Sequence, residues 1–514
     1  MRNKLVDKYQ DSSFKYYDVK ALANQDSEAK PDVNFTVSTI EVYSDSQYRI
    51  PLTEVVSMAF EPEIYVKVTG CGTDPEIINS LIFEISSTDD KSGFSVILVE
   101  TTPSSNEFRG KFRLGRYSNP SENKIGVSIK KRVYLKVNSR NISKTHNFTV
   151  DGIWKTLGKR GEGSDGTIED LSMAISGSGI VYVAFIDIDG GSGGVSVKKF
   201  EKGKWQNVGL PGFSMPAKGV QIFVYNEVPF VAFSEEMPDG SGKKLSVMRY
   251  SGGAWSYLGQ QGFSKGEPAY VSLCIYNGVV YVACSDGGDK SRVMVKKYDE
   301  RDWKNVGPTG FSDTNITYVN IGVQADIVYV AYKNHYTKSY EPEEGSLDRA
   351  RAKVKRFVNN SWEDVASDSI CKNQIEDISL CISDGVLYVA LRSNEQNSPG
   401  SALVDGYLEV KKFDGTSWNN IGGEHIAPVF HYLTIDVENT VPYVSYIRLQ
   451  GRAENTGTIK VLTYEKENWI KVGQEEISDR GVFYPVVKVY NGSVYIAYRD
   501  EGESAKLTVK KFEW

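Results

Sequence analysis

Histidine and cysteine are scarce in this sequence, and long apolar runs are missing. The 514 residues include only four histidines and five cysteines. No histidine lies in an HExxH motif or near a GxSxG elbow, so the common patterns of zinc peptidases and serine hydrolases are excluded. No stretch approaches the roughly 20 apolar residues that a membrane-spanning helix needs. We therefore expect no catalytic residues and no membrane insertion.

Charge of one sign is not concentrated anywhere either. Lysine and arginine total 60 and aspartate and glutamate 66, and both kinds are spread along the chain. A nucleic-acid partner would require a basic patch, so none is expected. The five cysteines are too few and too irregularly spaced for a disulfide framework, and we expect those within apolar strands to be buried thiols. His425 and His431 share one loop and could approach each other as metal ligands, but the absence of a patterned carboxylate or thiol favours ordinary loop histidines.

A repeated unit is what the sequence has in abundance. A short apolar run recurs about every 50 residues, and a period of this size with several short strands per unit is typical of a β-propeller. The pattern of each repeat predicts four strands. The second strand carries the apolar run and a small residue suited to close packing. The seven runs are "VYVAF" at Val181, "PFVAF" at Pro229, "VYVAC" at Val280, "VYVAY" at Val328, "LYVAL" at Leu387, "PYVSY" at Pro442 and "VYIAY" at Val494.

Tryptophans indicate how the ring of repeats closes. Six of them open a fourth strand of the form "WxxVG", and packing is favoured over sugar stacking because each lies next to apolar residues. The segment "DGIWKTLG" has the same form but precedes the first complete repeat, whereas the last repeat stops at "LTVKKFEW" without a fourth strand. We therefore predict that residues 151–158 supply the missing strand of the last blade, which removes an open sheet edge.

These repeats resemble the seven-bladed β-propellers with "YVAY…VKKF…WxxVG" units of bacterial surface and secreted proteins. Residues 31–150 show alternating strands, and their "VILVETTPSSNEFRGKFRLG" stretch is similar to a hairpin of immunoglobulin-like modules. The expected fold class is therefore all-β, with a seven-bladed β-propeller preceded by an immunoglobulin-like β-sandwich. The expected organisation is a flexible arm at 1–30, the sandwich at 31–150 and the propeller at 151–514.

Loop lengths predict which face of the propeller binds a ligand. The loops between second and third strands are long and varied, while the turns at the other face are short. We call the face that carries these loops, together with the connections between blades, the long-loop face; loops on rigid scaffolds often carry function. The longest loop offers aromatic, acidic and basic groups together. The candidate ligand-binding residues there are Tyr336, Tyr340, Glu343, Asp348 and Arg349.

Carboxylates close behind the second strands give a further alternative. A ring of acidic oxygens could hold calcium, which takes six to eight oxygen ligands. Aspartate is equally a common turn residue, and this interpretation is favoured, so no cofactor is expected apart from calcium as the alternative. The candidate calcium ligands are Asp187, Asp189, Asp286, Asp289 and Asp500.

The function favoured by these patterns is non-enzymatic. Diverging loops on a repeated scaffold, without an acid–base or nucleophile set, predict a binding or structural module of a bacterial cell surface or secreted assembly, with a protein or glycan as partner. The alternative is a propeller-type polysaccharide hydrolase or lyase, with carboxylates at the mouth of the channel as acid and base. A propeller scaffold inside the cell is also allowed. The expected location is extracellular or at the cell surface, which requires that a leader was removed, because the first 20 residues have no apolar signal core.

Overall fold

The structure is a computed structural model that divides the chain into two compact units. The first comprises Met1–Ile153 with Phe512–Trp514, and the second comprises Trp154–Lys511. Among the described residues, no helix is long and apolar enough to cross a membrane. The residues that the structure describes are 35–52, 55–57, 62–73, 76, 78–115, 118–127, 131–139, 142–189, 193–336, 349–366, 370–371, 373–394, 406–449, 457–465, 467–473, 476–479 and 481–513.

The first unit is built on one hydrogen-bonded sheet. Its strands follow the order β1-β3-β6-β5-β4-β8-β9-β2, with β7 pairing β6, and residues of β1 also approach β9, so the sheet curls back on itself. Burial alternates along the strands, which places one face of apolar residues inside the curl. The elements are β1 (Thr36–Tyr43), β2 (Val55–Ser57), β3 (Glu63–Cys71), β4 (Ser80–Ser87), β5 (Phe94–Glu100), β6 (Glu107–Gly115), η1 (Pro120–Glu122), β7 (Lys124–Gly126), β8 (Arg132–Ser139) and β9 (Ile142–Asp151).

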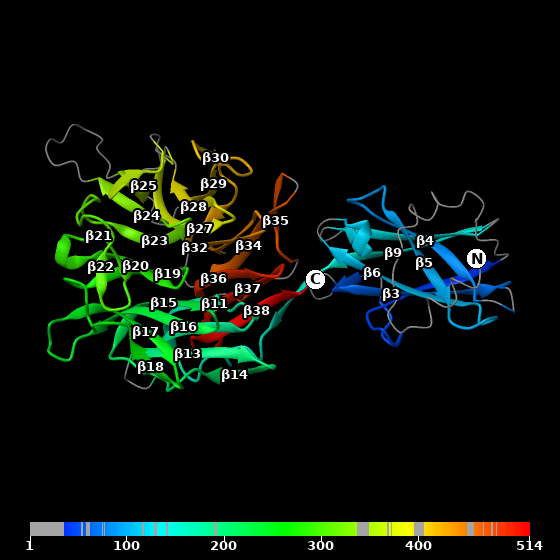
Figure 1. The fold of residues 1–514 in the computed structure, drawn as a ribbon, viewed down its shortest axis with the longest axis horizontal. Helices are drawn as coiled ribbons and strands as arrows, with labels where there is room; N and C mark the ends of the chain where they lie inside the picture. Colours follow the sequence, from blue (N-terminus) through cyan, green and yellow to red (C-terminus); the bar gives the residue numbers. More distant parts are fainter. Residues whose placement is uncertain are drawn as a thin grey trace. The chain divides into compact units, whose positions relative to one another are not determined.

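The second unit is a seven-bladed β-propeller, which confirms the predicted all-β class and blade number. Each blade is an antiparallel sheet whose strands follow one another in sequence, apart from the last blade. Figure 1 shows the first strands gathered at the centre of the propeller and the fourth strands at its rim. The first strands are β11 (Ile168–Ile175), β15 (Ala217–Tyr225), β19 (Pro268–Tyr276), β23 (Thr317–Gln324), β27 (Gln374–Ser383), β32 (His431–Glu438) and β36 (Val482–Tyr490).

The remaining strands continue each blade outward. The second strands are β12 (Val181–Asp187), β16 (Val228–Glu236), β20 (Val279–Asp286), β24 (Ile327–Tyr336), β28 (Val386–Asn394), β33 (Val441–Leu449) and β37 (Ser493–Asp500). The third strands are β13 (Gly194–Glu201), β17 (Lys243–Ser251), β21 (Arg292–Tyr298), β25 (Arg349–Val358), β29 (Gly406–Phe413), β34 (Gly457–Glu465) and β38 (Lys506–Glu513). The fourth strands are β14 (Lys204–Asn207), β18 (Ala254–Tyr257), β22 (Trp303–Asn305), β26 (Ser361–Asp364), β30 (Trp418–Asn420), β35 (Asn468–Lys471) and β10 (Ile153–Thr156); β31 (Pro428–Val429), η2 (Gly287–Asp289) and η4 (Glu501–Glu503) lie in connections.

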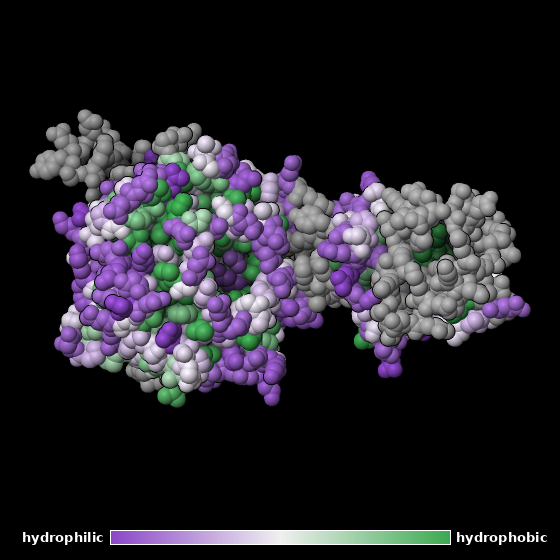
Figure 2. Space-filling model, viewed as in Figure 1, coloured by the Kyte–Doolittle hydropathy of each residue, from purple (hydrophilic) through white to green (hydrophobic). Residues whose placement is uncertain are grey.

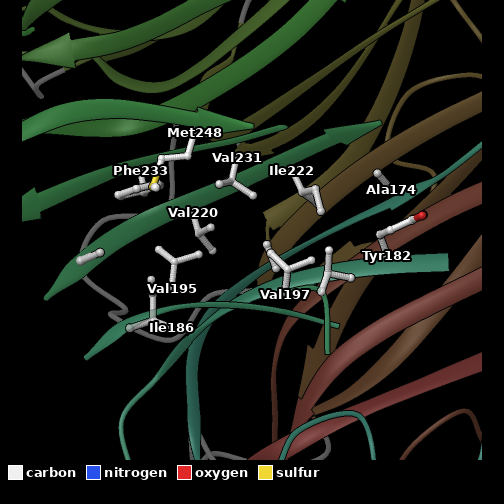
Figure 3. Close-up of a cluster of buried hydrophobic side chains, with 13 residues drawn as sticks. Ala174, Tyr182, Ile186, Val195, Val197, Val220, Ile222, Val231, Phe233 and Met248 are labelled. Carbon is white, nitrogen blue, oxygen red and sulfur yellow. The ribbon is translucent and has the colours of Figure 1, made fainter. Parts of the chain in front are cut away.

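The core of the propeller lies between neighbouring blades. Both faces of a second strand are buried because each sheet packs against two others, and the small residue at its middle, such as Ala184 or Ala232, is fully inaccessible. Figure 3 shows the cluster between the first two blades, where Val195 and Val197 lie on one sheet and Val231 and Phe233 on the next. Each fully buried side chain of this kind contributes about 1.5–3 kcal/mol of transfer free energy.

In six blades, a tryptophan at the start of the fourth strand donates a hydrogen bond to the blade before it. The indole Nε1 of Trp255 donates to the carbonyl oxygen of Val208 in the preceding blade at 2.7 Å, and Trp303 donates to Leu258 at 2.8 Å. A phenylalanine of the repeated "GFS" motif stacks on the tryptophan of the next blade, as Phe263 does on Trp303 with ring centroids 4.4 Å apart. The repeated tryptophans therefore serve packing between blades, as the sequence favoured.

Strand β10 makes the same kind of junction where the two ends of the propeller meet. It pairs with β38 and is the fourth strand of the last blade, although it precedes all other propeller strands in the sequence. Trp154 on β10 donates to the carbonyl of Val472 at 3.1 Å, and the carbonyl of Leu157 accepts from Trp205 of the first blade at 2.8 Å. The two ends of the propeller sequence thus share one blade.

Candidate functional site

Each first strand carries a β-bulge close to its beginning. In all seven blades the first strand has one residue more than the second strand at this point. The extra residue lies, for example, between Lys218 and Gln221 and between Thr317 and Asn320. First strands begin, and second strands end, at the edge of the disc from which the long loops emerge. The bulges therefore lie at the long-loop face, and bulges often re-aim side chains beside functional sites.

The bulges present a different residue in each blade. We define the axial ring as the residues two positions before the one that pairs with the small residue of the second strand. In blade order these are Asp170, Gly219, Tyr270, Tyr318, Asp377, Tyr432 and Tyr484. The four tyrosines have left-handed φ angles of 53° to 55°. This conformation costs a bulky residue about 1–2 kcal/mol, and backbone strain of this kind concentrates at functional sites.

The tyrosines of the axial ring form two pairs across neighbouring blades. The ring centroids of Tyr270 and Tyr318 are 5.1 Å apart, and those of Tyr432 and Tyr484 are 5.0 Å apart. Tyr270 is 42% exposed and the other three are half-buried. Burial raises the pKa of all four phenols, so they are protonated at neutral pH. Each pair offers aromatic surface together with hydroxyl groups.

Asp377 stands between the two tyrosine pairs, in the blade that separates those of Tyr318 and Tyr432. It is 6% exposed and accepts a hydrogen bond from the backbone N–H of Leu433 at 3.1 Å. Burial raises the pKa of Asp377 to about 7, against the opposing effect of the Leu433 N–H and of the cations of Arg392 and Lys333. A carboxyl group with this pKa exchanges its proton readily at neutral pH, as a general acid must.

Asp170 is the second carboxylate of the axial ring, on the opposite side of the propeller axis from Asp377. It is half-buried and accepts a hydrogen bond from the backbone N–H of Gly219 at 2.9 Å. Its charge contributes to the raised pKa of Tyr432 and of Tyr484. Asp170 therefore lies close to the second tyrosine pair.

Cations approach the axial ring from the second strands. Three of the seven blades carry one at the position two residues beyond the small residue: Lys333, Arg392 and Arg499. The Lys333 Nζ lies 2.9 Å from Glu376 Oε2 and 5.8 Å from the ring centroid of Tyr318. Arg392 is the register partner of Asp377. Figure 2 shows the propeller surface hollowed near its centre, with hydrophilic residues in the hollow.

Two of the five predicted ligand-binding residues, Tyr336 and Arg349, lie within the described residues. Tyr336 and Arg349 are opposite each other at the last register pair of β24 and β25. Tyr340, Glu343 and Asp348 fall outside the described residues. A ligand at this loop therefore stays a prediction, and neither Tyr336 nor Arg349 belongs to the axial ring.

The predicted calcium ligands use their oxygens within the protein. Asp286 accepts hydrogen bonds from the backbone N–H groups of Lys265, Gly266 and Gly288, and Asp500 is paired with Arg160 at 2.9 Å. Asp189 accepts from the Thr167 N–H, Asp289 pairs with Arg292 at 3.7 Å, and burial raises the pKa of Asp187. In the part of the chain that the structure describes, no three metal-ligating side chains form a group that could hold an ion. Calcium stays a prediction that these contacts do not favour.

Among the described residues, histidines and cysteines form no shared metal centre. His425 stacks on Tyr407 with centroids 4.4 Å apart, and His431 lies against Tyr432 at 5.7 Å, beside the axial ring. All five cysteines are free thiols; Cys284 and Cys371 are buried, which confirms their predicted burial, whereas Cys274 and Cys381 are only half-buried. Burial raises the pKa of these four thiols, so they are poor nucleophiles.

Sequence reasoning missed the axial ring although the sequence carries a signal for it. The ring residues precede the small polar residue of the first strand in segments such as "PAYVSL", "ITYVN" and "EDISL". In each segment the tyrosine or aspartate looks like one more strand residue. Only an alignment of the seven repeats, position by position, shows that this site varies between tyrosine, aspartate and glycine while the residue after it stays apolar.

Comparisons with solved structures give similarities of low sequence identity. The polysaccharide lyase Uly1 has a TM-score of 0.46 and 9% identity, over 66% of this chain and 89% of that one. The GH93 α-L-arabinofuranosidase of Fusarium graminearum has a TM-score of 0.36 and 10% identity, over 60% and 97%. A Trypanosoma rangeli sialidase mutant has 0.35 and 12%, over 61% and 56%. No protein-family model and no curated protein sequence matches the chain.

These structures correct one prediction. The sequence favoured a non-enzymatic binding or structural module, but the similar structures include arabinofuranosidases, a lyase and sialidases, which favours the alternative of a propeller-type hydrolase or lyase. The prediction that the chain is not an enzyme is therefore wrong on this comparison. The sequence prediction rested on the absence of a local catalytic motif. In the axial ring, acidic and aromatic residues from different blades come together without such a motif.

Proposed function

We propose that this protein hydrolyses glycosidic bonds in a polysaccharide at the axial ring. One observation carries the proposal: Asp377, a buried carboxyl with a pKa raised to about 7, stands between two tyrosine pairs, with a second carboxylate across the axis. Aromatic faces suit the apolar C–H surfaces of sugar rings, and the phenol hydroxyls suit their polar edges. Two carboxyl groups on opposite sides of a bond are what glycoside hydrolysis requires.

The proposed roles of the two aspartates follow from their surroundings. Protonated Asp377 donates its proton to the glycosidic oxygen as the bond from that oxygen to the anomeric carbon breaks. The carboxylate of Asp170 accepts a proton from the water whose oxygen attacks the anomeric carbon. Arg392 and Lys333 stabilise the carboxylate that Asp377 leaves behind, because their charges lower its pKa. Bulk solvent then returns the proton from Asp170 to Asp377.

The test is an activity screen of the full chain against soluble polysaccharides built from glucose, xylose, arabinose, galactose and galacturonic acid. We expect new reducing ends on at least one of them and no ultraviolet absorbance from an unsaturated sugar, since hydrolysis adds water. Appearance of the unsaturated product would show that the bond is cleaved by elimination and not by hydrolysis. Absence of cleavage across the whole panel would contradict the proposed function.

Two variants in one blade locate the activity. Asp377→Asn removes the proton donor, and we expect a loss of activity of roughly 10²–10⁴-fold. Asp384→Asn is the matched control, since Asp384 lies in the exposed turn after β27, at the far end of the same strand, with a φ of 49° that asparagine adopts readily. Equal losses in the two variants would show that the axial ring is not the active site.

For the first unit and for the location of the protein, the proposal is based on the sequence resemblance. We propose that the curled sheet of the first unit is an immunoglobulin-like module that spaces the propeller on a cell surface or in a secreted assembly. A polysaccharide substrate supports this location, because structural polysaccharides built from such sugars lie mostly outside the cell.

A further inference from the structure

The order of residues around the axial ring is not random. Starting at the third blade it runs Tyr270, Tyr318, Asp377, Tyr432, Tyr484, so that one tyrosine pair stands on each side of Asp377. The inner members of the two pairs belong to the two blades next to that of Asp377. Each pair is held together by its own ring contact, at 5.1 Å and 5.0 Å between centroids.

The opposite side of the ring is built differently. Gly219 leaves the second blade without a side chain, and Tyr270 beside this gap is the most exposed of the four tyrosines. Asp170 borders the gap on its other side and accepts the hydrogen bond of the Gly219 N–H. The aromatic surface therefore forms an arc centred on Asp377 and not a closed circle.

From this arc we infer two sugar subsites, the Tyr270–Tyr318 pair and the Tyr432–Tyr484 pair, that bind neighbouring units of one glycan with the bond between them at Asp377. This inference rests on the proposed function and deepens it, because it states the minimum ligand. A monosaccharide reaches only one pair, whereas a disaccharide contacts both and places its glycosidic oxygen at the acid. The protein then recognises a chain segment and not a terminal sugar alone.

The strained backbone supports a binding role for both pairs. The left-handed φ recurs at Asp170 (41°) and Gly219 (65°), so the bulge belongs to the repeat. Glycine would adopt this conformation without strain, yet four blades place a tyrosine there at φ angles of 53° to 55°. The bulges lie at the long-loop face, and each of the four tyrosines keeps part of its surface exposed, Tyr270 most of all.

The experiment is calorimetric titration of the full-length Asp377→Asn chain with mono-, di- and tetrasaccharides of glucose, xylose, arabinose, galactose and galacturonic acid. For the sugar whose polysaccharide is cleaved, we expect the disaccharide to bind at least roughly tenfold more tightly than the monosaccharide, because it adds a second aromatic contact. We expect Tyr270→Ala and Tyr484→Ala, each added to Asp377→Asn, to remove most of that gain.

Matched controls separate binding from folding. Tyr276→Ala and Tyr490→Phe change tyrosines at the far ends of the same strands, β19 and β36, and should leave the affinity for the disaccharide unchanged. In the otherwise unaltered chain, Tyr270→Ala should raise KM for the disaccharide without moving the pH dependence of kcat, which a general loss of folding would not do selectively.

The outcomes distinguish this inference from the function on which it rests. Cleavage of a polysaccharide together with equal affinities for mono- and disaccharide, or unchanged affinities in both tyrosine variants, would overturn the two subsites and leave the hydrolase intact. No binding of any panel member together with no cleavage would overturn both.

Discussion

Asp377 and the tyrosines of the axial ring obtain their chemistry from burial and position. A carboxyl group in water titrates near pH 4, whereas the surroundings of Asp377 raise its pKa to about 7. Burial also raises the pKa of the four phenols further above neutral pH. Residue types alone could not predict this, because the sequence contains many other aspartates and tyrosines. Their identities were visible in the sequence, but which of them the bulges would gather around the axis was not.

The pH dependence of activity follows from the raised pKa of Asp377. The proton donor is present below its pKa and absent above it, so kcat should fall as pH rises through about 7. The measurement is kcat as a function of pH for the unaltered chain, with Asp384→Asn as control. A residual activity of Asp377→Asn that keeps the same alkaline decline would assign that decline to another group.

A side chain introduced at two different glycines should affect the stability of the propeller to different degrees. Gly219 has a φ of 65°, close to that of the ring tyrosines, and a Cβ there would meet only Val271 Cγ2 at 3.7 Å. We expect Gly219→Tyr to fold with a melting temperature within a few degrees of the unaltered chain, which differential scanning calorimetry measures.

Gly422 has a similar φ, but its surroundings leave no space for a Cβ atom. Its Cβ would lie 2.4 Å from Trp469 Nε1, the indole that joins the fifth and sixth blades. Gly422→Ala should therefore lower the free energy of unfolding by about 1–3 kcal/mol. A larger destabilisation by Gly219→Tyr than by Gly422→Ala, measured by denaturant unfolding, would show that the axial ring has no open position.

Strands and blade junctions were the most predictable elements. Apolar runs with a small central residue, such as "VYVAF" at Val181, predicted the second strands, and "WxxVG" segments predicted the fourth strands, because burial on both faces and a tight turn leave clear patterns. The β-bulges were not predictable in the same way. A bulge depends on the register between two strands, and "PAYVSL" is compatible with regular pairing.

The blade junctions give a prediction at this scale. Trp303 is 5% exposed, stacks on Phe263 and donates to the Leu258 carbonyl at 2.8 Å. Trp303→Phe keeps an aromatic ring but leaves that carbonyl without its partner, which should cost about 1–3 kcal/mol in the free energy of unfolding. Denaturant unfolding monitored by circular dichroism measures the change. Unfolding at the same denaturant concentration as the unaltered chain would mean that the junction contributes little.

The whole molecule is organised by closure of the ring. Seven repeats and an isolated "DGIWKTLG" segment made the number of blades predictable from composition and spacing alone. The same view of the whole chain led the sequence analysis to the long loop after β24, and the axial ring was not considered. Residues from the first, third, fourth, fifth, sixth and seventh blades meet there only because the ring closes.

Removal of the closing strand should therefore affect the whole propeller. Deleting residues 151–158 removes β10, both hydrogen bonds that Trp154 and Leu157 make to neighbouring blades, and the partner of β38. We expect a fall in melting temperature on the order of 10 °C. Deleting residues 1–30, which lie outside the described residues, should change it far less. Equal melting temperatures for the two deletions would contradict closure by β10.

The most direct test of the account is a crystal structure of the Asp377→Asn chain soaked with the disaccharide that binds it most tightly. We predict one sugar unit on the Tyr270–Tyr318 pair, the other on the Tyr432–Tyr484 pair, and the glycosidic oxygen at the side chain of residue 377. A disaccharide bound instead at the loop between Tyr336 and Arg349, or at the turns on the opposite face of the propeller, would contradict the assignment of the axial ring as the functional site.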